Sequence, residues 1–170
     1  MNPVRAYDYL MLARAKLFDW IRPLSQERYT QEFPFGLHTL RATMVEIAGG
    51  EWVYARRLRG EPVPPEEERP IREERLPTFA DLEPVWQAQA QRTHALLAAI
   101  RDWDQPIEYR VGRPDKTIVV SVTVGDIATQ LCFHEIHHRA QAMAMLRQLG
   151  IAAQNLDFSV FMFHRTDLPA

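Results

Sequence analysis

The stretch TVGDIATQLCFHEIHHRAQAMAMLRQLG, residues 123–150, predicts one long helix and carries the most informative residues of the chain. Thr123 followed by Asp126 is close to a capping box, and Gly150 suits the left-handed position that ends a helix. Between these ends, apolar residues recur at helical spacing, at Val124, Ile127, Leu131, Met145 and Leu149. We therefore predict a helix from Thr123 to Leu149 with one face turned toward a core.

Two histidines lie within this apolar stripe. His134 and His138 are four residues apart, so their side chains share one face of the helix and are expected to point into the bundle. Buried imidazoles need partners because each ring has a donor and an acceptor. A metal ion satisfies this need, and pairs at this spacing are good zinc ligands. The pattern favours a metal site over two core histidines bonded to side chains or water.

The segment HEIHH, residues 134–138, also matches the H-E-x-x-H pattern of zinc metalloproteases. Such an enzyme needs a third ligand downstream, and no glutamate follows Glu135; Asp157 and His164 are the nearby candidates. One predicted hairpin also gives too little sheet to hold a peptide substrate. The protease is therefore the least favoured interpretation, and we expect both Glu135 and His137 at the rim of the site.

Working outward from this helix, the rest of the chain predicts three more long helices. The segment between the second and third, residues 60–77, holds five prolines and many charges, which suits neither a helix interior nor a central strand. A connection of this length lets those two helices run parallel. The predicted elements are helices over 2–23, 37–58, 78–103 and 123–149, a hairpin over 107–122 and a short amphipathic segment over 156–163.

These elements predict an all-α fold: a four-helix bundle with a long crossover between helices 2 and 3, a small β-hairpin before helix 4 and a short C-terminal helix. The length of 170 residues fits a single domain over 1–170. A net charge of −2 gives no reason to expect nucleic acid or a membrane as partner. With one cysteine, Cys132, and no leader-like or long apolar segment, we expect a cytoplasmic protein.

The chain resembles the DinB/YfiT-like family of damage-inducible four-helix bundle proteins. The resemblance extends over nearly the whole length and is most specific in TLRATMVEIAGGEWVYARRLRGEP, residues 39–62, and in residues 123–150. The latter match the family pattern His-x-x-x-His-Arg-x-Gln at His134, His138, Arg139 and Gln141. The resemblance implies a divalent metal, zinc or nickel with iron or manganese as alternatives, held by two histidines from this helix and one from the second.

At the position of the family's third ligand, this chain has Glu46 instead of histidine. Two imidazoles and a carboxylate would leave an open position, which suits catalytic zinc and also ferrous iron. Gly49 and Gly50 share the face of Glu46 and would let another helix approach, which favours a buried carboxylate. His38 is the alternative ligand, and a site that has lost its metal is a third interpretation. His137 and Gln141 are candidates for residues that orient the ligands.

The resemblance also carries two functional hypotheses. Several characterised relatives are thiol-dependent transferases that use bacillithiol or mycothiol, and one group isomerises maleylpyruvate. The first hypothesis is a metal-dependent thiol S-transferase or hydrolase-like enzyme that acts on a small electrophilic substrate, with a low-molecular-weight thiol as cofactor. The second is a non-enzymatic stress-response or metal-binding bundle with a degenerate site. In either case the resemblance implies a homodimer.

Overall fold

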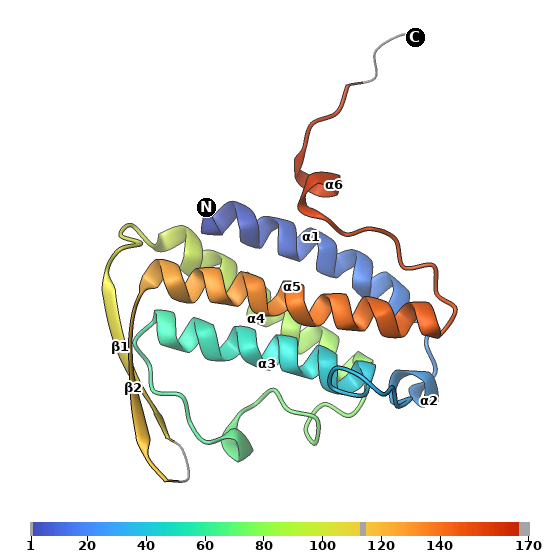
Figure 1. Ribbon diagram of the computed structural model, residues 1–170, viewed down its shortest axis with the longest axis horizontal. Coiled ribbons are helices and arrows are strands. Elements are labelled where there is room, and N and C mark those ends of the chain that lie inside the picture. Colours follow the sequence, from blue (N-terminus) through green and yellow to red (C-terminus); the bar gives the residue numbers. More distant parts are fainter. Residues whose placement is uncertain (1, 113–114, 167–170) are drawn as a thin grey trace.

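The computed structural model describes residues 2–112 and 115–166. Its long helices are α1 (Pro3–Ile21), α3 (Leu40–Leu58), α4 (Phe79–Ala99) and α5 (Val124–Gln148). They form a bundle in which α1 packs on α4 and α5, and α3 packs on the same two helices (Figure 1). The all-α four-helix bundle predicted from the sequence is confirmed.

The chain direction in the bundle follows from the crossover. Helices α3 and α4 run the same way, and the connection between them returns along the outside of the bundle (Figure 1). It contains one short turn of 3-10 helix, η1 (Glu66–Glu68). Because its prolines lack backbone donors, this segment forms no long helix or strand of its own. Its position matters because it covers one side of α3.

The helix ends obey local rules that are visible in the sequence. Thr78 with Asp81, and Thr123 with Asp126, each form a complete capping box. Gly60 follows α3 with a φ of 68°, a left-handed conformation that glycine adopts without strain. These residues therefore fix where α3 ends and where α4 and α5 begin.

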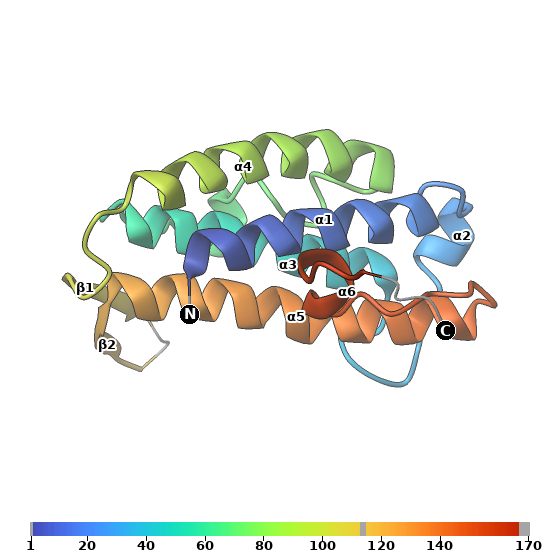
Figure 2. The same cartoon turned by 90° about the horizontal axis from the view of Figure 1, so that it is seen from above.

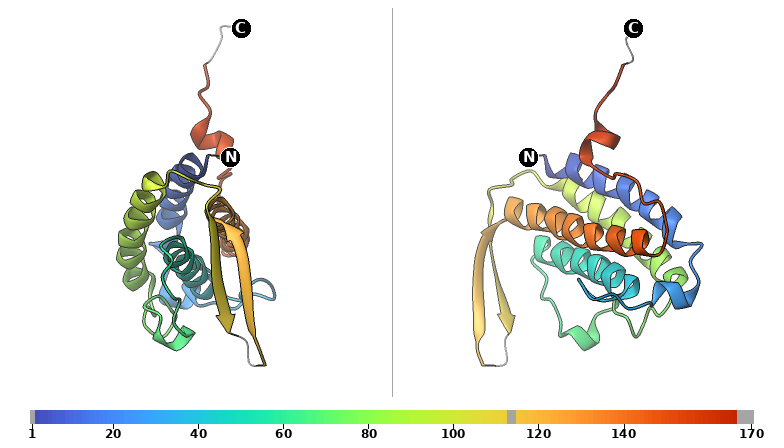
Figure 3. Two further views of the ribbon diagram at one scale, coloured as in Figure 1. Left: turned by 90° about the vertical axis from the view of Figure 1, so that its left-hand side faces the viewer. Right: turned by 45° about the vertical axis from the view of Figure 1, so that its right-hand side comes forward.

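Three smaller elements complete the fold. The hairpin pairs β1 (Pro106–Gly112) with β2 (Thr117–Thr123) in antiparallel register and projects from one end of the bundle (Figure 3). Its turn was predicted at GRPDK, of which residues 113–114 lie outside the described residues. The short helix α6 (Phe158–Met162) lies beside α1 (Figure 2). The sequence did not predict α2 (Gln26–Tyr29), which has a single turn.

Charged residues occupy the centre of the bundle. The Arg14 guanidinium from α1 donates hydrogen bonds to Glu51 on α3 at 2.8 Å and to Glu135 on α5 at 2.5 Å. Tyr7 and Trp86 also donate to Glu51, at 2.6 and 2.9 Å. Burial alone would lower the pKa of Arg14, but the two carboxylates outweigh it and hold that pKa well above its ordinary value. The cluster therefore joins α1, α3, α4 and α5 around a permanently charged group.

This arrangement corrects the expected place of Glu135. Its side chain is in the core, with 2% of the residue exposed, and not at the rim of the histidine face. The physical reason is that the Arg14 guanidinium reaches Glu135 from α1, and Arg139 lies 3.9 Å from it one turn along α5; their positive charge makes the interior tolerable for a carboxylate. The histidines flank this buried stripe on the side facing α3. Within the described residues, no helix is long and apolar enough to cross a membrane.

Candidate metal centre

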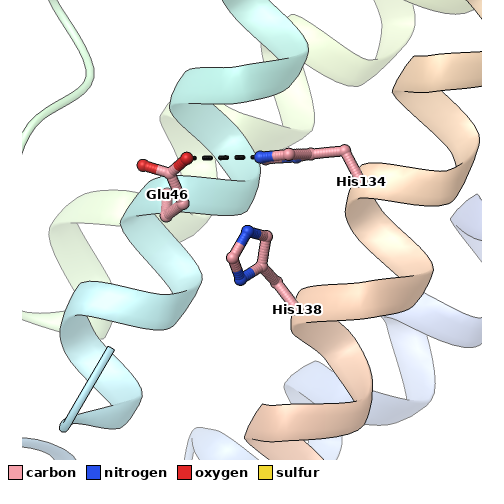
Figure 4. A group of neighbouring side chains, drawn as sticks. All are labelled: Glu46, His134 and His138. Atoms are coloured by element: carbon pink, nitrogen blue, oxygen red, sulfur yellow. Dashed lines mark hydrogen bonds and ion pairs between the residues drawn. The ribbon is translucent and has the colours of Figure 1, made fainter. Parts of the chain in front are cut away.

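Three side chains converge where α3 and α5 pack together. Glu46 projects from α3, while His134 and His138 project from successive turns of α5 (Figure 4). Each offers one donor atom, and these three atoms lie within 4.8 Å of one another. Glu46 Oε1 and His134 Nε2 are 3.2 Å apart. Two ligands of one tetrahedral zinc are separated by about 3.4 Å, given metal–ligand distances of about 2.0–2.1 Å.

Gly50 makes room for the first imidazole. A Cβ at this position would lie 2.4 Å from Cε1 and 2.8 Å from Nδ1 of His134, closer than real Cβ contacts. The His134 ring therefore occupies the space that a side chain at position 50 would fill, one turn along α3 from Glu46. Gly49 is different, because its added Cβ would meet the Ile71 carbonyl oxygen at an ordinary 3.4 Å. Only Gly50 is needed for the approach of His134.

A chain of hydrogen bonds orients the second imidazole. His138 Nδ1 lies 3.0 Å from Gln141 Oε1, and the Gln141 amide nitrogen lies 3.1 Å from His137 Nε2. When Nδ1–H donates a hydrogen bond to Gln141 Oε1, the lone pair of His138 Nε2 is available to bind a metal ion, as in many metal sites. Burial lowers the pKa of His138, which favours the neutral ring that a metal needs.

Glu46 is ionised but not buried as expected. A hydrogen bond from His134 lowers the pKa of its carboxyl, against the opposing effect of burial, and the positive charge of Arg69 contributes to the lowering. Half of the Glu46 side chain (50%) is exposed, against 14% for His134. The expectation of a buried carboxylate was wrong: Gly50 admits the His134 ring from α5, and the Glu46 carboxylate stays at the surface. The three-residue group is thus open to solvent on the carboxylate side.

His38 lies apart from these three side chains. It is in the loop before α3 with a φ of 66°, and its Nδ1 atom is 3.1 Å from the Phe33 carbonyl oxygen. The group of potential ligands found in the described residues contains Glu46 and does not contain His38. Of the two alternatives for the third ligand, the geometry therefore favours Glu46.

The other residues of the HEIHH segment have different surroundings. Glu135 lies about 80° round α5 from the centre of the histidine pair. Its carboxylate is buried and held by Arg14, so it is not placed to act as a general base beside a metal. His137 is exposed; it contacts Gln141 at 3.1 Å, and its ring lies 4.9 Å from the His138 ring. Cys132 is buried, and burial raises the pKa of its thiol to about 12, which fits a packing role rather than a nucleophile.

A cavity of about 330 Å³ opens beside the group. Its walls come from one face of α3 and from the crossover, and both Glu46 and His134 line it. Tyr54 also lines it, with its ring 5.6 Å from the His134 ring, whereas Phe133 is on the outer face of α5 and exposed. The aromatic residue expected near a pocket is therefore Tyr54.

The residues present fit a divalent metal ion. Two imidazoles and a carboxylate match a common catalytic zinc set, and a space at Gly50 admits one imidazole while Gln141 orients the other. Glu46, His134 and His138 can therefore hold such an ion. Three protein ligands leave at least one coordination position for a small molecule.

Two features of this region were not predicted. The buried Arg14 cluster had a signal, because Arg14 falls between Leu10 and Leu17 on an apolar stripe, where a charge needs a buried partner. The arginines that line the cavity had a weaker one. Arg57 follows Glu46 by eleven residues, about three helical turns, and therefore shares its face.

Comparisons with known proteins agree with this architecture. Residues 1–167 match the family model described as the DinB family. The chain is also similar to Protein DinB of Bacillus subtilis (strain 168), with 23% identity over 163 residues, which cover 94% of this chain and 92% of that protein. The similarity therefore extends over both chains almost entirely.

Proposed function

Because this chain belongs to the DinB family, and because its own residues form a three-ligand group, we propose that it binds one divalent metal ion through Glu46, His134 and His138. The observation that carries the proposal is the convergence of three donor atoms at a place where Gly50 has no side chain. Zinc or nickel suits two imidazoles and a carboxylate, and iron or manganese are alternatives to be distinguished by metal analysis.

We further propose that the protein is a metal-dependent transferase or hydrolase-like enzyme for small electrophiles. The ion, when bound, would lower the pKa of a thiol or water in its open position and so supply a nucleophile at neutral pH. In this scheme Gln141 keeps the lone pair of His138 directed at the site. Glu46 is half exposed and lines the cavity together with His134, so a substrate would enter from the cavity.

Metal content is the first test. Untagged protein purified without chelator should contain about one zinc, nickel or iron per chain by plasma mass spectrometry. The variants Glu46→Ala and His134→Ala should lose it. His94→Ala is a suitable control, since His94 is on α4 and pairs with Asp8 at 2.9 Å. If none of the unaltered protein takes up metal, even after incubation with zinc and nickel, the proposal is wrong.

Activity is the second test. The loaded protein should accelerate the reaction of 2-mercaptoethanol with 1-chloro-2,4-dinitrobenzene. In that reaction sulfur bonds to the ring carbon, chloride leaves with the bonding electrons, and the thiol proton passes to the buffer. His134→Ala should reduce the rate to that of the uncatalysed reaction. If the protein binds metal but accelerates neither the reaction of the thiol nor the reaction of water with this electrophile, a metal-binding bundle without enzymatic activity is favoured.

A further inference from the structure

Two arginines that line the cavity have no carboxylate partner in the described part of the chain. Arg57 comes from the last turns of α3, and Arg69 comes from the crossover on the facing wall. The Nε atom of Arg57 is buried and has no hydrogen-bond partner among the described residues. Arg69 donates through Nε to the Pro64 carbonyl oxygen at 3.2 Å, which leaves its other donors for a ligand. Unpaired guanidinium groups in a partly enclosed place are unusual, because their desolvation is normally compensated.

Arg57 is directed along the same face as the candidate metal ligands. Its guanidinium carbon is 5.6 Å from the centre of the Tyr54 ring, and that ring is 5.6 Å from the His134 ring. The guanidinium also stacks on Tyr109 of β1 at 4.3 Å, which holds it in place from the hairpin. A small molecule could therefore reach from the open position near His134 across Tyr54 to Arg57.

The acidic residues of the cavity do not cancel this charge. Glu73 is paired with Arg41 at 2.7 Å, and Glu74 is paired with Arg72 at 3.7 Å. Glu66, in η1, is exposed. Glu46 also lines the cavity, and Arg69 helps to lower its pKa, but its carboxylate is paired with His134 and not with an arginine. Two guanidinium groups therefore have no ion pair within residues 2–112 and 115–166, while the nearby carboxylates disfavour a ligand with several negative charges.

We propose that the cavity takes a small molecule carrying a carboxylate, which Arg57 and Arg69 bind while the opposite end of the molecule faces Glu46 and His134. This names the substrate class for the proposed function and rests on that function for the role of the metal. The guanidinium fork matches a carboxylate in a bidentate geometry. A singly charged carboxylate fits these surroundings better than phosphate, because the acidic residues on the walls repel extra negative charge.

The test uses pentanoate, which carries one carboxylate, and its uncharged amide, pentanamide. Each is titrated into metal-free and into zinc-loaded full-length protein labelled with ¹⁵N, and the Nε–H signal of Arg57 is followed by NMR. Pentanoate should shift this signal in both forms, and pentanamide should not. Affinities of the variants are measured by isothermal titration calorimetry, because Arg57→Gln has no such signal. Arg57→Gln and Arg69→Gln should each weaken pentanoate binding on the order of tenfold, the usual effect of losing a hydrogen bond to a charged group. Both variants should keep the zinc content of the unaltered protein.

The matched control is Arg56→Gln. Arg56 is next to Arg57 on α3 but is already engaged, with Nε bonded to the Pro62 carbonyl oxygen and NH1 paired with Glu61 at 3.2 Å. Its loss should leave pentanoate binding unchanged. Equal binding of pentanoate and pentanamide, equal effects at positions 56 and 57, or stronger binding of inorganic phosphate would each overturn the assignment. Absence of zinc would refute the proposed function only, since the metal-free titration judges the anion site by itself.

Discussion

The substitution Gly50→Ala should strongly weaken metal binding without harming the fold. The new Cβ would lie 2.4 Å from Cε1 of His134, whereas carbon atoms in contact are separated by about 3.5–4.0 Å. The ring must therefore move by about 1 Å or more, against a tolerance of about 0.2 Å for metal–ligand distances. Because changes beside a ligand already cost about 10–100-fold in affinity, we expect zinc affinity to fall by at least about 100-fold.

In the same variant, the free energy of unfolding of the metal-free protein should rise or stay unchanged. Alanine is more favourable than glycine in a helix interior by about 0.8–1.0 kcal/mol, and the displaced ring can move toward solvent at little cost. Zinc affinity is measured by competition with a chromogenic chelator, and unfolding is measured with urea on chelator-treated protein. Gly49→Ala is the control: it has the same gain in helix propensity, and its added Cβ makes an ordinary contact with Ile71. Wild-type zinc affinity in Gly50→Ala would show that His134 does not bind metal in this position.

Three further predictions concern α5. Glu135→Ala removes a carboxylate from the buried Arg14, so it should lower the free energy of unfolding by about 3–5 kcal/mol; a loss below about 1 kcal/mol in urea would contradict this role. Gln141→Leu removes the acceptor for His138 and should weaken zinc binding by about 10–100-fold, as measured by chelator competition. The urea midpoint of the metal-free protein should stay the same. An unchanged zinc affinity would count against the orienting role of Gln141. Burial raises the pKa of Cys132 from 9.0 to about 12, so the folded state holds a proton that the unfolded state releases. Stability should therefore fall as the pH rises above about 9, less steeply in Cys132→Ala, and native protein should resist Ellman's reagent at pH 8; rapid labelling would refute this.

The local features of the sequence were sufficient for the bundle. Capping boxes at Thr78 and Thr123 and the glycine at position 60 act within a few residues, so their effects are the same whatever surrounds them. The prolines of residues 60–77 exclude a regular element in the same local way. By contrast, the single turn of α2 over Gln26–Tyr29 is too short to produce a hydrophobic period, and the sequence did not predict it.

The i, i+4 spacing of His134 and His138 determined by itself that the two imidazoles share one face of a helix, because helical geometry fixes this for any packing. Which face is buried was decided by tertiary contacts. Arg14 approaches from α1, and its positive charge makes Glu135 the core residue and leaves the histidines at the boundary with α3. The same packing brings Glu46 to His134, with Gly50 admitting the ring, and leaves His38 in its loop. Glu46 and His134 are 88 positions apart in the sequence, so their contact depends on how α3 packs on α5. Local periodicity does not encode that packing.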